Sequence, residues 1–184
     1  MKYQQLTLLI LITLFLSACE FKCQVGNMDK KEETSTNPAS QKAVTPKTLN
    51  GIELNAKDVQ VSRAFLSLDN GELVPSDNTV SLGEKISLVI NIDNGWKETA
   101  GKCFIGASEK ITTDNGTELL STGDMFSSYN ETGLDATDAK VITLKARITS
   151  APPGPVEYYM VNFRVWDKKG NGEITGKYKF HVRL

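Results

Sequence analysis

Hydrophobic side chains at every second residue are the feature of this sequence that most restricts its fold. The pattern is clearest in residues 84–93 and 140–148. The expected core-facing side chains are Ile86, Leu88, Ile90 and Ile92 in the first segment, and Ile142, Leu144, Ala146 and Ile148 in the second. Because side chains of a strand point alternately to its two faces, a period of two predicts β-strands with one face buried.

The C-terminal segment repeats this alternation on both sides of a short polar turn. The residues expected to face the core are Tyr159, Val161, Phe163 and Val165 before the turn, and Tyr178, Phe180, Val182 and Leu184 after it. Residues 167–173 read DKKGNGE, and glycine and asparagine are the residues that a tight loop needs. The segment therefore predicts an antiparallel hairpin.

Weaker alternation predicts four more strands. They cover residues 59–68, 73–80, 102–112 and 118–122, and Asp-Asn-Gly sequences at 69–71 and 114–116 supply turns. Seven or eight short strands in about 135 residues favour a single all-β domain, an antiparallel β-sandwich over residues 50–184. A closed barrel is the alternative. The strand pattern resembles the immunoglobulin and fibronectin type III class, whose last two strands pair as a long hairpin, although the paired cysteines of antibody domains are missing.

The first 18 residues have the composition of a secretion signal. Lys2 precedes an apolar run over residues 6–16, which is too short to span a bilayer because spanning takes roughly 20 residues. The run ends in Leu16-Ser17-Ala18-Cys19, which resembles the lipobox of bacterial lipoprotein precursors. This resemblance implies cleavage before Cys19 and acyl chains, palmitate among them, on that cysteine. An ordinary signal peptide with a chance cysteine is the alternative.

Many envelope lipoproteins of the Bacteroidota resemble this combination of a lipid anchor and an immunoglobulin-like domain. The resemblance implies a protein of the cell envelope that is anchored by lipid to a bacterial membrane. It favours the outer membrane and leaves open whether the domain faces the periplasm or the exterior. Residues 19–49 are rich in Lys, Glu, Thr, Ser and Pro and predict a flexible tether between the anchor and the domain.

Three cysteines are too few for a disulfide framework. If Cys19 carries lipid, only Cys23 and Cys103 remain to form a bridge. Two free thiols are the favoured interpretation, and a bridge that pins the tether to the domain is the alternative.

Charge and residue types argue against several functions. The whole sequence has 21 Lys and Arg residues and 22 Asp and Glu residues. Removal of residues 1–18 would remove Lys2, so the remaining chain would have a net charge of about −2. Nucleic-acid binding needs a clustered basic surface, so we expect none. With His181 as the single histidine, we expect no metal site, no cofactor and no catalytic residues. A Cys103–His181 pair is the weakest alternative, and a calcium site among Asp124, Glu131, Asp135 and Asp138 is another.

Several aromatic and basic residues are candidates for a ligand or partner surface. Trp96, Phe126 and Tyr129 lie in expected loops, where they either contact a ligand or close the ends of the core. Tyr158 and Trp166 lie on the outer face of one strand of the hairpin, opposite Lys177 and Lys179 on the other. These four predict an aromatic and basic strip suited to an anionic polymer or a partner domain, although lysines also protect edge strands from aggregation.

These features together predict a non-catalytic, membrane-anchored lipoprotein whose β-sandwich binds or scaffolds a protein or another surface component. A carbohydrate-binding module of a surface glycan-uptake system is the alternative, and it would use exposed loop aromatics.

Overall fold

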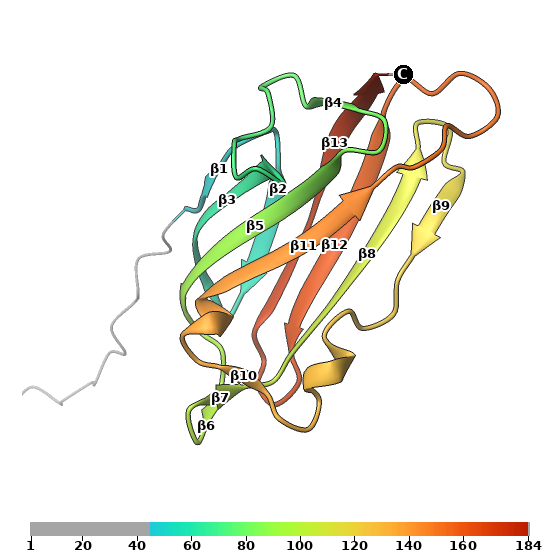
Figure 1. The fold of residues 1–184 in the computed structure, drawn as a ribbon. Helices are drawn as coiled ribbons and strands as arrows, with labels where there is room; N and C mark the ends of the chain where they lie inside the picture. The colour runs from blue at the N-terminus through green and yellow to red at the C-terminus, as the bar shows by residue number, and fades with distance from the viewer. Residues whose placement is uncertain (1–44, 184) are drawn as a thin grey trace, which may run out of the picture. The chain divides into compact units, whose positions relative to one another are not determined.

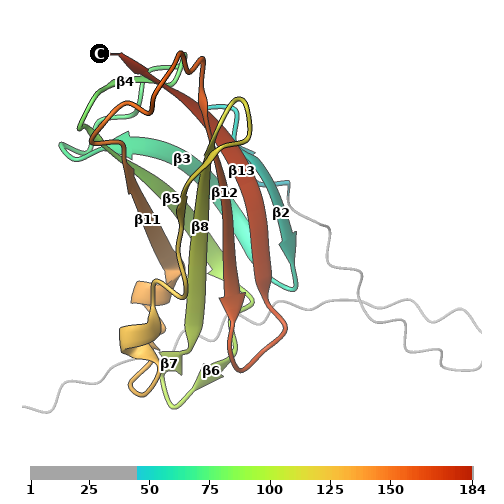
Figure 2. The ribbon, with the colours of Figure 1, turned by 90° about the vertical axis from the view of Figure 1, so that its right-hand side faces the viewer.

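A β-sandwich of two main sheets makes up the part of the chain that the computed structural model describes, residues 45–183 (Figure 1). The smaller sheet has four strands in the order β1 (Lys47–Thr48), β3 (Gln60–Leu68), β5 (Lys85–Asn94) and β11 (Val141–Arg147). The larger sheet has six: β2 (Glu53–Lys57), β13 (Glu173–Arg183), β12 (Tyr159–Asp167), β8 (Ile105–Thr113) and β9 (Glu118–Ser121) in that order, with β4 (Thr79–Ser81) also beside β13. Figure 2 shows the two layers facing each other. The prediction of an all-β sandwich is confirmed.

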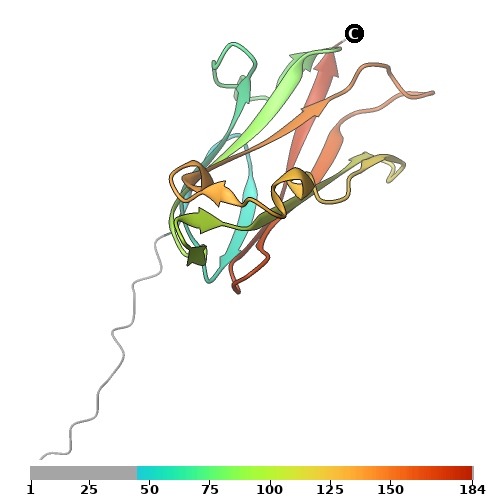
Figure 3. The same ribbon diagram turned by 60° about the horizontal axis from the view of Figure 1, so that its bottom comes forward.

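One end of the sandwich carries a third, smaller sheet and two short helical turns. The sheet has the order β10 (Leu134–Asp135), β7 (Lys102–Cys103) and β6 (Glu98–Thr99). The 3-10 turns are η1 (Ser127–Tyr129) and η2 (Asp138–Lys140). This end is at the bottom of Figure 1, and Figure 3 turns it toward the reader.

The core lies between the sheets and includes the side chains that the alternation predicts. Those of β5 and β11 are buried, and in the hairpin Tyr159 stacks on Phe180 with ring centroids 5.2 Å apart. Two details differ from the prediction: Ile148 is buried but lies beyond the end of β11, and Val182 is only half-buried. Leu184 lies outside the described residues. Each strand has one apolar face, so the two sheets bury these faces against each other.

The predicted strand over residues 73–80 is wrong for most of its length. A single bridge joins Leu73 to Ser67, and β4 begins only at Thr79. Pro75 lacks the N–H that a ladder needs, and Asn78 has a φ of 56°, which is left-handed backbone. The buried Asn78 amide donates to the Asn50 and Lys179 carbonyl oxygens, both at 2.8 Å, so it ties this loop to the larger sheet.

The predicted strand over 102–112 is two strands that belong to different sheets. Cys103 of β7 pairs with Glu98 and Leu134 in the small sheet, whereas β8 begins at Ile105 and pairs with β12. The strand β2 was not predicted at all.

The sandwich is also not wholly antiparallel, because β1 pairs with β3 and β4 pairs with β13 in parallel. Strand pairing begins at Lys47, before the domain boundary expected at residue 50. The expected signal peptide, Cys19, Cys23 and most of the expected tether lie outside the described residues. Within residues 45–183, no helix has the length and apolarity needed to cross a membrane.

Candidate functional site

The outer face of the larger sheet brings together side chains from segments far apart in the sequence. On this face Lys179, Lys177, Thr175 and Glu173 of β13 lie opposite Met160, Asn162, Arg164 and Trp166 of β12, in that order. On the other side of β13, strand β2 places Glu53 beside Lys177, Asn55 beside Thr175 and Lys57 beside Glu173. The register therefore gives a continuous outer surface across three strands.

Tyr158 and Lys179 form one end of this surface. The Lys179 ammonium nitrogen lies 4.2 Å from the centroid of the Tyr158 ring, which is within the range of a cation–π contact. The His181 ring meets Tyr158 edge-on at 6.5 Å and hydrogen-bonds the Glu157 carbonyl through Nδ1 at 2.7 Å. These contacts fix the orientation of the half-buried tyrosine ring.

Trp166 and Arg164 form the other end. The Trp166 ring lies against the backbone of Gly106 on β8, where a Cβ atom would come within 2.3 Å of the ring. The Arg164 guanidinium lies 4.9 Å from the ring centroid, and its Nε contacts Glu173 Oε1 at 2.5 Å. Trp166 is therefore half-buried and held flat on the sheet between these neighbours.

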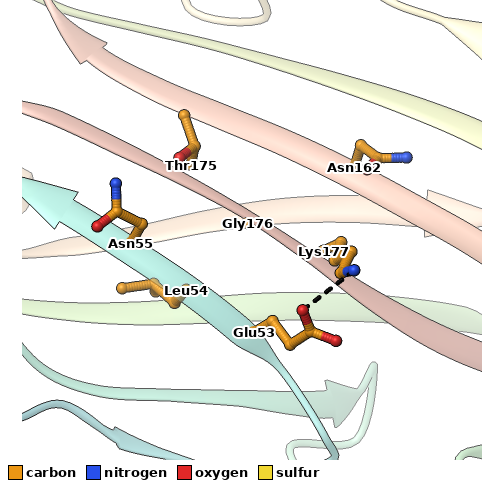
Figure 4. Close-up of a pocket in the computed structure, with 7 residues that line it drawn as sticks. All are labelled: Glu53, Leu54, Asn55, Asn162, Thr175, Gly176 and Lys177. Carbon is orange, nitrogen blue, oxygen red and sulfur yellow. Dashed lines mark ion pairs between the residues drawn. The ribbon is translucent and has the colours of Figure 1, made fainter.

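An open hollow lies between the two ends, with a volume of about 330 Å³. Figure 4 shows the residues that line it: Glu53, Leu54, Asn55, Asn162, Thr175, Gly176 and Lys177. The side chains of Asn55, Asn162 and Thr175 make no hydrogen bond with any of the described residues. The hollow thus offers two amides and a hydroxyl to solvent.

Ion pairs neutralise most charges of this surface. Lys177 Nζ lies 3.1 Å from Glu53 Oε2, and Arg164 contacts Glu173. Of the four residues of the predicted strip, the structure brings Tyr158 and Lys179 into contact, but Trp166 lies beside Arg164 and not beside the lysines. Carboxylates thus compensate Lys177 and Arg164, whereas no ion pair within residues 45–183 involves Lys179. Binding of an anionic polymer to the predicted strip stays a prediction.

The three loop aromatics do not form one cluster. Trp96 is half-buried, packs against the core and donates from Nε1 to the Ala139 carbonyl oxygen at 3.1 Å. Phe126 also packs against the core, and its ring centroid lies 6.3 Å from that of Tyr129. Tyr129 is exposed on 43% of its surface. These contacts suit the closing of the sandwich end better than they suit a shared platform for a ligand.

Two acidic residues of the same loops, Asp124 and Asp135, have partners other than a metal. Asp124 accepts hydrogen bonds from the backbone N–H groups of Ala107 and Phe126 and pairs with Lys168 at 2.5 Å. Burial opposes the ionised form of Asp124, but the contact with Lys168 and the hydrogen bonds from the Phe126 and Ala107 N–H groups together lower its pKa. Asp135 pairs with Lys102 at 2.8 Å. No three acidic, histidine or cysteine side chains in residues 45–183 are placed to hold a metal ion.

Cys103 and His181 lie at opposite ends of the sandwich. Cys103, in β7, stands two residues before the end of β8 that pairs with Asp167, whereas His181 lies beside Tyr158 at the other end of β12. Cys103 is a free, buried thiol, and burial raises its pKa, which disfavours the reactive thiolate. The structure does not bring this pair together.

Sequence reasoning missed Glu53 and Asn55 because residues 53–57 read ELNAK, in which asparagine, alanine and lysine are poor strand formers. The signal was the alternation of Ile52, Leu54 and Ala56 with polar residues. It also missed Glu109, which shares the inward face of β8 with Ile105, Ala107 and Ile111. The same period of two would have placed this carboxyl group in the core.

Comparisons with known proteins give a likeness to solved structures only. No protein-family model and no curated protein matches the chain. Eleven chains of solved structures match it, among them the C-terminal domain of wzt, at 13% identity and a TM-score of 0.44. That alignment covers 76% of this chain and 83% of the other.

Proposed function

We propose that this chain is a non-catalytic lipoprotein of the bacterial cell envelope. Acyl chains on Cys19 hold the protein at the outer membrane, and the β-sandwich binds another envelope component. The lipobox-like sequence Leu16-Ser17-Ala18-Cys19 supports the anchor.

The outer face of the larger sheet is the binding surface in this proposal. The observation that carries it is the arrangement of Tyr158 and Trp166 at the two ends of one strand, with an open polar hollow between them. Ligand sites combine apolar or aromatic contact area with a few convergent polar groups, and this face has both.

Site-directed photo-cross-linking in the producing cells tests this assignment. A photo-reactive phenylalanine analogue replaces Met160 in one variant and Val89 in another, since both are half-buried apolar residues on outer sheet faces. We expect a covalent adduct from position 160 and none from position 89, because only the first lies on the proposed surface. Adducts of equal yield from both positions, or none from position 160, would contradict the proposal.

A further inference from the structure

We infer that the hollow around Gly176 binds a segment of a neutral polysaccharide. This inference rests on the proposed function and names the ligand class and the contacting residues. The ligand hydroxyls would meet Asn55, Asn162 and Thr175, and a longer chain would extend along β12 toward Tyr158 or Trp166.

The hydrogen-bonding groups of the hollow match hydroxyl-rich ligands. A sugar hydroxyl both donates and accepts, and an amide side chain offers a donor and an acceptor side by side. Asn55 and Asn162 are exposed amides on opposite sides of β13, and Thr175 adds a hydroxyl between them. A ligand in the hollow can therefore satisfy several hydroxyls without the protein having to break its own hydrogen bonds.

The charge of the hollow favours a neutral ligand. Glu53 and Lys177 are the two charged residues that line it, and they form an ion pair with each other, as the dashed line in Figure 4 marks. An anionic polymer would have to compete with Glu53 for Lys177. A neutral polyol can instead hydrogen-bond to both members of the pair.

The distribution of apolar side chains disfavours a protein as the occupant of the hollow. The core of a protein–protein interface is enriched in large apolar and aromatic residues. The exposed large hydrophobic residues of the described chain lie elsewhere: Leu73, Leu82, Leu119, Leu120, Met125, Tyr129 and Val141. None of them lines the hollow.

The spacing along β12 favours a polymer over a single sugar. Asn162 lies midway between Tyr158 and Trp166, four residues from each. At ~3.4 Å per strand residue this separation is about 14 Å on each side. A chain that occupies the hollow and reaches either aromatic residue must therefore contain several units.

Affinity electrophoresis of the full-length protein in detergent tests the inference. The gels contain dextran, mannan, xylan or the polysaccharide extracted from the envelope of the producing bacterium, and alginate serves as the anionic probe. We expect retardation by at least one neutral polysaccharide. Removal of one amide, in Asn55→Ala or Asn162→Ala, should weaken it about tenfold, the upper range for one lost hydrogen bond.

Control variants distinguish a loss of binding at the hollow from a general effect of substitution on the protein. Asn171→Ala removes an exposed amide of the β12–β13 loop outside the hollow and should leave the retardation unchanged. Trp166→Ala should weaken binding of the polysaccharide but not of a short oligosaccharide of the same sugar. Circular dichroism of each variant checks that the fold is intact.

Three results would overturn the inference: no retardation by any neutral polysaccharide, retardation by alginate alone, or equal retardation of wild type and both amide variants. A protein adduct from position 160 together with no polysaccharide binding would refute the glycan ligand and leave the proposed function standing. The absence of any adduct from position 160 would refute the proposed function itself.

Discussion

At the scale of single residues, Glu109 places a carboxyl group in the core. Its side chain is 2% exposed, and neither carboxyl oxygen has a hydrogen-bond partner within the described residues. Burial raises the pKa of this carboxyl from 4.5 to about 7. The Tyr178 hydroxyl is buried without a partner as well, and its burial and then the charge of Glu109 raise the pKa of Tyr178 well above its usual value.

The raised pKa of Glu109 predicts a stability that falls as the pH rises. The folded protein holds the Glu109 proton more tightly than the unfolded chain does. The resulting contribution to stability is therefore complete below pH ~4.5 and lost above pH ~7. The difference between the two pKa values corresponds to a free energy of about 3 kcal/mol. We expect Glu109→Gln to raise the free energy of unfolding by about 2 kcal/mol at pH 8 and by little at pH 4.5, as measured by urea denaturation.

The exposed Glu118, which pairs with Lys110 on the surface, provides the control. Glu118→Gln should change the free energy of unfolding by less than about 1 kcal/mol at either pH, because exposed ion pairs contribute little. If Glu109→Gln gave the same change at pH 4.5 and pH 8, Glu109 would not titrate in this range.

At the scale of strands, the packing of β2, β13 and β12 depends on a glycine. Gly176 pairs with Leu54 on one side and with Phe163 on the other, and it faces the core. A Cβ atom at this position would lie 2.4 Å from the Phe163 ring and 2.4 Å from the Glu53 carbonyl oxygen. The glycine therefore gives the buried Phe163 ring its place under the hollow.

This contact predicts that Gly176→Ala destabilises the domain. Insertion of a methyl group into a packed core costs about 1 to 3 kcal/mol, so we expect the free energy of unfolding to fall by about 2 kcal/mol. Gly123→Ala is the control, because no atom lies within 4 Å of a Cβ built there. Denaturant titrations of both variants should show a loss for the first alone, and equal stabilities would contradict the described packing.

The strands also show which parts of the fold could be predicted from the sequence. Strands β5, β11, β12 and β13 were predicted because each has several apolar residues at alternate positions. The conformation of the loop before β4 was not predicted, because it depends on a hydrogen bond between Asn50 and Asn78, which lie 28 residues apart in the chain. The hollow could not be predicted for the same reason, since Asn55 and Asn162 become neighbours of β13 only through strand pairing.

At the scale of the whole molecule, the proposed function combines a lipid anchor with a binding domain. Burial of each methylene of an acyl chain contributes about 0.8 kcal/mol, and stable anchoring takes more than one chain. The proposed anchor would raise the local concentration of the domain at the membrane surface. A domain without the anchor would lose this local concentration even with an intact binding face.

The most direct test of the account is to remove the proposed lipid site. Cells that express wild type, Cys19→Ala or Cys23→Ala are labelled with radioactive palmitate and separated into membrane and soluble fractions. We expect wild type and Cys23→Ala to carry label and to sediment with membranes, and Cys19→Ala to carry none and to leave the membrane fraction after a high-salt wash. A Cys19→Ala protein that still sediments with membranes as wild type does would contradict the account.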